Sequence, residues 1–282
     1  MTRLPLVTVS KEAEGGDLSK LTTLDVQGRN LTEIDDLDSC ANLRSLNASR
    51  NQLETMDWCC MNLNLVELII SENNMRHVSA RIGNLANLQT LNLSDNELRS
   101  LPSLAGMDSL RTLILRNNKI SELPPLGYLP SLRTVILSEN RLRSFPRFEA
   151  PALRKISLTS NRLTTFPFGV EFAHVVELRL HKNRIQNIPQ EVCSMASLSL
   201  IDLGHNPLVD ESSLTHLGSV RALSNLNLRD TPLLEKLGDG AAEFVLTRCP
   251  RVSIFNNQRI AEPERKRPLQ KSRIPRQKKF KR

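Results

Sequence analysis

The sequence has few aromatic residues and no long apolar run. One Trp and one Tyr occur among 282 residues, and aromatic residues make up 4% of the chain. With a hydrophobic fraction of 39%, this composition predicts a core of aliphatic side chains, above all Leu. The lack of a run of about eighteen apolar residues excludes a membrane-spanning helix. We expect no secretory signal, because residues 1–10 lack an apolar core.

The cysteines do not form a pattern of pairs. There are five, at Cys40, Cys59, Cys60, Cys193 and Cys249. An odd number without paired spacing argues against a disulfide framework and against a zinc site. We therefore expect reduced, mostly buried thiols in an intracellular protein of the nucleus, the nucleolus or the cytoplasm, with the cytoskeleton or axoneme as a further location.

A repeat of 21 to 25 residues runs through most of the chain. The segment from Leu88 to Leu98, LQTLNLSDNEL, matches the pattern L-x-x-L-x-L-x-x-N-x-L at every marked position. Arg29 and Thr231 replace Asn in the first and last copies, which are weaker. The frame begins at Leu21, Leu43, Leu65, Leu88, Leu110, Leu132, Leu153, Val175, Leu198 and Leu223. Such regular self-similarity predicts a stack of structural repeats.

This pattern resembles the leucine-rich repeat family over roughly residues 18–260. The resemblance implies an α/β solenoid, a leucine-rich repeat arc with a parallel β-sheet on its concave face and irregular or short helical segments on its convex face. In this family the Asn side chain is buried and bonds backbone groups of adjacent turns. The corresponding residues here are Asn51, Asn73, Asn96, Asn118, Asn140, Asn161, Asn183 and Asn206.

The repeats divide the chain into four parts. We predict an N-terminal cap segment at 1–17, about ten repeats at 18–240, a C-terminal cap at 241–262 and a basic tail at 263–282. The C-terminal cap contains a helix-like run at 242–248. It resembles the terminal caps of phosphatase-1 regulatory repeat proteins, of the U2 small nuclear ribonucleoprotein A-prime family and of axonemal repeat proteins.

Side-chain alternation along each short strand predicts the concave surface. The outward position between two inward Leu-type residues is Ile in two neighbouring repeats, Ile114 and Ile136. This pair fits either simple strand propensity or an apolar anchor for a partner. His181 and His205 lie on outward positions of neighbouring repeats near Asp202, where we interpret them as surface or recognition residues and predict no metal site.

Positive charge is concentrated in repeats five to eight, where eleven basic residues face only Glu139 and Glu177. We predict that this stretch, together with the two isoleucines and His181, binds an acidic protein surface or a phosphate backbone. Four of the basic residues follow the Asn slot and should form a ladder along one rim: Lys119, Arg141, Arg162 and Arg184. The others are Arg111, Arg116, Arg133, Arg154, Lys155, Arg179 and Lys182.

The C-terminal tail holds ten further basic residues and, from residue 265 on, no acid. They are Arg265, Lys266, Arg267, Lys271, Arg273, Arg276, Lys278, Lys279, Lys281 and Arg282. Removing these ten from the 38 Lys and Arg residues leaves 28, against 30 Asp and Glu. The composition predicts a disordered tail that serves as a nuclear import signal, a nucleic-acid arm or a contact for acidic protein, including tubulin tails.

The sequence contains no Walker loop, Gly-rich dinucleotide turn, His-Glu-x-x-His motif or Cys-x-x-Cys pair. We therefore predict no enzyme activity, cofactor, metal, small-molecule substrate or membrane contact. The scarcity of exposed aromatics argues against sequence-specific reading of single-stranded RNA. The favoured hypothesis is a non-catalytic protein-interaction scaffold whose tail contacts RNA or acidic protein in a larger assembly. The alternatives are a regulatory subunit of a phosphatase and a structural protein of the axoneme or microtubules.

Overall fold

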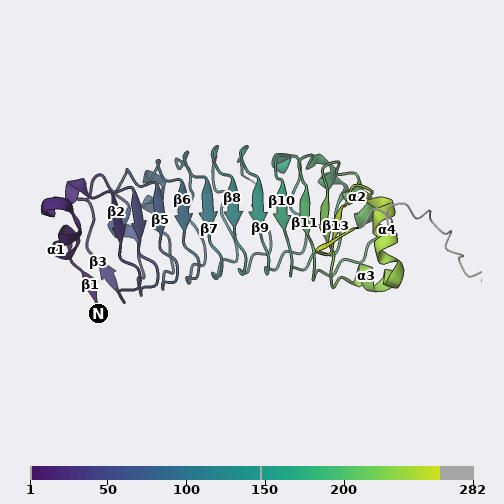
Figure 1. Ribbon diagram of the computed structural model, residues 1–282, viewed down its shortest axis with the longest axis horizontal. Helices are drawn as coiled ribbons and strands as arrows, with labels where there is room; N and C mark the ends of the chain where they lie inside the picture. The colour runs from purple at the N-terminus through teal and green to yellow at the C-terminus, as the bar shows by residue number, and fades with distance from the viewer. Residues whose placement is uncertain (1, 147, 261–282) are drawn as a thin grey trace, which may run out of the picture.

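The computed structural model describes residues 2–146 and 148–260, which form one long stack of short strands (Figure 1). A 12-stranded sheet runs in the order β14-β13-β12-β11-β10-β9-β8-β7-β6-β5-β4-β2. All neighbours are parallel except β13 and β14. The strands are β2 Thr23–Asp25, β4 Ser45–Asn47, β5 Glu67–Ile69, β6 Thr90–Asn92, β7 Thr112–Ile114, β8 Thr134–Ile136, β9 Lys155–Ser157, β10 Glu177–Arg179, β11 Leu200–Asp202, β12 Asn225–Asn227, β13 Ile254–Phe255 and β14 Gln258–Arg259.

Each three-residue strand of this sheet, from β2 to β12, contributes its middle residue to the core. Leu113 on β7 pairs in register with Val135 on β8, and both side chains are completely buried. Because the strands are parallel and in register, the inward residues of successive repeats form one continuous aliphatic column. The predicted solenoid with its parallel sheet is therefore confirmed.

The turn after each strand depends on the residue before the Asn slot. Asn117, Glu139 and Ser160 have φ values of 50°, 59° and 57°, and the equivalent residue of every other repeat is also left-handed. This conformation lets the chain reverse sharply after three strand residues. The Asn side chains that follow are buried and bridge repeats, as the resemblance implied.

The N-terminal end carries a small separate sheet. Strand β1, Arg3–Leu4, pairs in parallel with β3, Glu33–Ile34. The carboxylate of Asp35 binds the Arg3 guanidinium and accepts a 3.2 Å hydrogen bond from the backbone N–H of Leu6. Helix α1, Leu6–Val9, follows directly, and Val9 is 1% exposed. These contacts attach the first residues to the end of the stack.

Helices cover the C-terminal end (Figure 1). They are α2 Ser212–Gly218, α3 Pro232–Leu237 and α4 Ala241–Arg248. The helical run expected at 242–248 is thus confirmed as α4. Short 3₁₀ turns lie elsewhere, at Ser10–Glu12, Glu14–Gly16, Leu18–Lys20, Asp57–Cys59, Ala80–Asn84, Val170–Phe172, Gln190–Ser194 and Gly238–Gly240. The basic residues 265–282 lie outside the described residues.

Candidate interaction surface

The outward strand residues form columns that run across the sheet. The column between the two inward positions is continuous in register from Asp25 on β2 to Asn227 on β12. Within it Ile114 pairs with Ile136, as the sequence predicted. Both isoleucines are half-buried, not fully exposed. Their neighbours in the stack therefore cover part of each side chain, and the pair presents a limited apolar strip.

Three arginines form a second column just before strands β7, β8 and β9. The backbone N–H of Arg133 donates to the carbonyl of Arg111 at 2.8 Å, and that of Arg154 donates to the carbonyl of Arg133 at 2.9 Å. All three side chains are exposed. The Arg154 guanidinium donates only to the carbonyls of Pro151 and Leu153. Among the described residues, no carboxylate pairs with any of the three, which we call the arginine ladder.

The basic residues after the Asn slot lie along a different edge. Backbone N–H groups of Arg141, Arg162 and Arg184 each donate, at 2.8 Å, to a carbonyl of the preceding repeat. The basic residues expected on this rim therefore do lie at the same position of successive repeats, and their role in binding stays a prediction. The rim lies eight residues further along each repeat than the arginine ladder. The basic residues of repeats five to eight thus include two separate rows, the arginine ladder and the rim that the sequence analysis expected.

Ion pairs neutralise part of the predicted basic surface. Arg116 contacts Glu139 at 2.9 Å, and Lys119 contacts Glu97 at 3.0 Å. Glu97 lies one repeat before the stretch that the sequence analysis considered, so this pair was missed. The arginine ladder and the rim arginines keep their charge without a carboxylate partner among the described residues.

Glu177 holds two further basic residues. Its carboxylate contacts the Lys155 ammonium at 3.2 Å and the Arg179 guanidinium at 2.5 Å. Burial raises the pKa of Glu177, but hydrogen bonds from Arg179 and Lys155 outweigh burial and lower the pKa below its usual value. Glu177 therefore stays ionised at neutral pH and offsets one of the two positive charges at β9 and β10.

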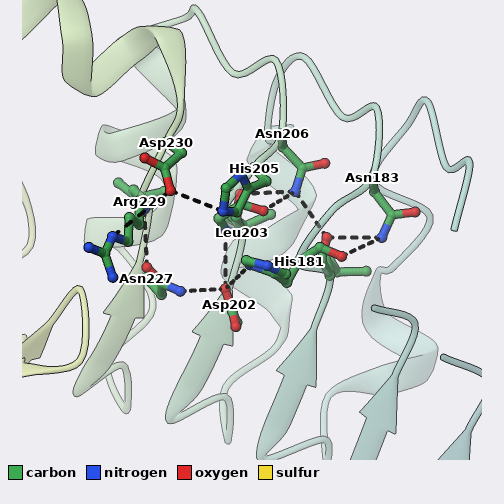
Figure 2. Close-up of polar contacts among 12 residues, drawn as sticks. His181, Asn183, Asp202, Leu203, His205, Asn206, Asn227, Arg229 and Asp230 are labelled. Atoms are coloured by element: carbon green, nitrogen blue, oxygen red, sulfur yellow. Dashed lines mark hydrogen bonds and ion pairs between the residues drawn. The ribbon is translucent and has the colours of Figure 1, made fainter. Parts of the chain in front are cut away.

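A histidine pair lies beyond this point, over strands β10 to β12. Figure 2 shows Asp202 between His181 and Asn227, whose amide donates to the Asp202 carboxylate at 2.8 Å. The Nδ1 atom of His181 is 3.6 Å from the Asp202 carboxylate, too far for a hydrogen bond, and is buried without a hydrogen-bond partner among the described residues. The His181 and His205 rings meet edge to face with centroids 4.7 Å apart. His205 pairs with Asp230 at 3.0 Å.

The protonation of His181 is controlled by its surroundings. Burial lowers its pKa, the nearby charges of His205 and Lys182 lower it further, and Asp202 opposes the shift. Lys182 is exposed beside this pair. Within the described residues, no group of three or more His, Cys, Asp or Glu side chains is placed to hold a metal ion.

The remaining surface shows a hollow over the same columns as the arginine ladder. It has a volume of about 380 Å³, lies on β4 to β6, and is lined by Arg44, Ser45, Val66, Glu67, Gln89 and Thr90. No helix in residues 2–146 and 148–260 is long and apolar enough to cross a membrane. Arg111 lies in the next repeat at the position that Gln89 has in this hollow, and its backbone N–H donates to the Gln89 carbonyl at 2.8 Å.

Known proteins resemble this chain in sequence and in fold. A family model described as leucine rich repeats in two copies matches residues 86–128 and 108–150. The U2 small nuclear ribonucleoprotein A' of Mycosarcoma maydis is 35% identical over 91 residues, which are 32% of this chain and 36% of that protein. The matched part thus spans about a third of the curated relative.

Two solved structures share the fold. The leucine-rich repeat domain of APL1B superposes with a TM-score of 0.62 at 18% identity, covering 79% of this chain and 72% of that one. The Toll–Spatzle complex of Drosophila superposes with a TM-score of 0.56 at 21% identity, covering 76% of this chain and 34% of that chain. The repeat frame, the leucine-rich repeat model at residues 86–128 and 108–150 and the parallel stack agree, and the chain has the leucine-rich repeat fold.

Proposed function

We propose that this protein is a non-catalytic scaffold that binds a protein partner on the sheet face of strands β7 to β10. The observation that carries the proposal is the arginine ladder beside the pair of Ile114 and Ile136. Surface arginines without carboxylate partners repel one another at the spacing of neighbouring strands, about 4.8 Å. An acidic partner relieves that repulsion, and the apolar strip supplies a contact from which water is excluded.

We place this scaffold in a nuclear ribonucleoprotein assembly. The similarity to a U2 small nuclear ribonucleoprotein A' supports this choice, although it covers only part of each chain. The basic residues 265–282, outside the described residues, would contact RNA phosphate or acidic protein there. A phosphatase complex and an axonemal or microtubule complex are the competing assemblies.

Affinity purification of the full chain, with and without nuclease, tests the proposal. We expect at least one protein to remain bound in a one-to-one complex after nuclease treatment, and ribonucleoprotein components to be lost with the RNA. Recovery of a phosphatase, or of tubulin and dynein components, would move the scaffold to another assembly. If no protein is retained after nuclease treatment, the scaffold function itself is contradicted.

A further inference from the structure

The sheet face over β7 to β9 has an arrangement of charge and apolar area that selects one kind of partner. Its first column is the arginine ladder, its second column begins with the short side chains of Thr112 and Thr134, and its third column holds Ile114 and Ile136. The Arg and Ile columns are three residues apart along each strand, or about 10 Å. Thr112 and Thr134 are half-buried and paired in register between these columns, and we call this strip of the sheet face the channel.

We propose that this channel binds an amphipathic α-helix whose acidic stripe meets the arginine ladder and whose adjoining apolar stripe meets Ile114 and Ile136. An α-helix with its side chains is about 10 Å wide, which matches the separation of the Arg and Ile columns. The proposal rests on the proposed protein-binding function and deepens it by naming the chemistry and the shape of the partner.

The pitch of the stack supports a helix that lies across the strands. One helical turn advances about 5.4 Å, whereas neighbouring strands are about 4.8 Å apart. Acidic residues spaced three or four residues apart on one helix face therefore lie at nearly the same spacing as the successive arginines, and each can contact one arginine over three repeats. An extended segment places side chains on one face about every 6.6 Å, and this spacing does not match the spacing of about 4.8 Å between the same arginines.

Other features of the sheet restrict where this helix lies. The ion pair of Arg116 with Glu139 lies beyond the Ile column, and Glu177 neutralises Lys155 at the β10 side. The hollow on β4 to β6 lies over the corresponding positions of the preceding repeats. A carboxylate accepts two parallel hydrogen bonds from a guanidinium, and this geometry favours Arg over Lys at a site of this kind.

Single-stranded nucleic acid fits this surface less well. The outward positions of strands β2 to β12 carry no Phe, Tyr or Trp on which bases could stack. The apolar pair beside the arginines also has no counterpart in a phosphate backbone. The observations therefore favour an acidic, amphipathic protein helix as the occupant.

The test measures binding of labelled peptides to the full-length protein by fluorescence anisotropy. The probe is an Ala-rich peptide of about 18 residues, long enough to form a helix, with Glu at i, i+4 and i+7 and a Leu stripe on the adjoining face. A second peptide has the same composition with the Glu residues distributed around the helix. It measures the background due to attraction of any acidic peptide to residues 265–282.

Two variants with the same change in charge isolate the site. One is the triple change Arg111→Glu, Arg133→Glu, Arg154→Glu, and its matched control is Arg141→Glu, Arg162→Glu, Arg184→Glu on the rim. We expect the first variant to weaken binding of the striped peptide by at least about tenfold, and the rim variant by less than about threefold. Melting temperatures of both variants should stay near that of the wild type, because every changed side chain is exposed.

A third variant tests the apolar strip. Ile114→Thr with Ile136→Thr keeps the β-branched shape, and should weaken the striped peptide several-fold without changing the salt dependence of binding. Three results would overturn the proposal: equal binding of both peptides by the wild type, equal loss in the two arginine variants, or tighter binding of a single-stranded RNA through the arginine ladder.

Failure of this inference can be separated from failure of the proposed function. If affinity purification recovers a nuclease-resistant protein partner and the ladder variant retains it fully, the protein is a scaffold and the channel is not its binding site. If the wild type retains no protein partner, the proposed function fails first. Loss of the partner in the ladder variant but not in the rim variant supports both.

Discussion

Each buried asparagine at the Asn slot forms hydrogen bonds with backbone groups of two neighbouring repeats. The Asn118 amide donates to the carbonyl of Leu115 in its own repeat at 3.1 Å and to that of Leu93 in the preceding repeat at 3.0 Å. Its side-chain oxygen accepts from the backbone N–H of Leu98 at 3.0 Å. Asn140 repeats the arrangement one turn later. Because donors and acceptor are all used, the buried amides are stabilising.

Replacing Asn118 or Asn140 by Ala should therefore destabilise the fold. Each change leaves backbone groups unpaired inside the stack, which costs about 1–3 kcal/mol. Chemical denaturation of the purified variants measures the loss, and the exposed Asn187→Ala serves as the control. If Asn118→Ala and Asn140→Ala had the same denaturation midpoints as wild type, the role of these amides would be contradicted.

His181 should make stability depend on pH. Burial keeps the folded-state pKa of His181 below its usual value, so the unfolded chain takes up a proton more readily than the folded one. The stability contributed by neutral His181 is complete above about pH 6.5 and is lost as pH falls through its depressed pKa.

Denaturation between about pH 7 and about pH 5 tests this effect. We expect His181→Asn to lose less stability over that range than wild type, whereas the exposed His174→Asn should follow wild type. An identical pH dependence of His181→Asn and wild type would contradict the prediction.

The helices of the C-terminal end are joined by a close contact that requires glycine. Gly218 ends α2, and a Cβ atom there would collide with the backbone carbonyl of Arg248 at the end of α4. Nearby, the Cys249 thiol donates to the carbonyl of Leu214 at 3.4 Å. Burial raises the pKa of that thiol to about 12, so it remains protonated at neutral pH. This end is thus closed by direct helix packing.

Gly218→Ala should separate α2 from α4. The clash is with backbone, which cannot turn aside as a side chain can, so we expect a loss of about 1–3 kcal/mol or more. Gly240→Ala is the matched control, because a Cβ atom there meets nothing within 4 Å. Thermal melting compares the two, and equal melting temperatures would show that the helices separate without cost.

The whole molecule is held together by contacts between neighbouring repeats, and its packing adapts where the repeat is irregular. Phe145, Phe148, Phe166, Phe168 and Phe172 form one cluster with ring centroids 5.2 to 6.0 Å apart. These rings fill the space behind β8 to β10, where aliphatic residues fill most of the other repeats. Stability shared across such interfaces predicts that damage in one repeat is felt in the next.

Truncation before Arg265 should leave the fold intact. The removed residues carry ten positive charges and few apolar side chains, so they have little with which to offset the entropy of ordering. We expect an unchanged melting temperature and weaker RNA binding, with a smaller slope of log affinity against log salt. A lower melting temperature would contradict this prediction. If the truncated protein binds RNA as the full-length protein does but no longer accumulates in the nucleus, these residues serve only as a nuclear import signal.

The sequence by itself determined the repeat, its inward residues and its outward columns. Periodic spacing was sufficient, because a short strand alternates its side chains and each repeat stacks in register on the next. It therefore predicted the pairing of Ile114 with Ile136, and the resemblance to the leucine-rich repeat family implied the buried asparagines. Glycine at position 218 and the left-handed residues before each Asn were missed, because packing between helices and backbone dihedrals leave no periodic signal.

The tertiary structure was needed to show which charges remain unpaired. A pair such as Lys119 with Glu97 joins side chains of neighbouring repeats, and the composition of one stretch does not reveal it. The same holds for Lys155 and Arg179, which share Glu177. Charge on a surface depends on which opposite groups lie within a few ångströms. For that reason only the stacked repeats showed which of the predicted basic residues have no carboxylate partner among the described residues.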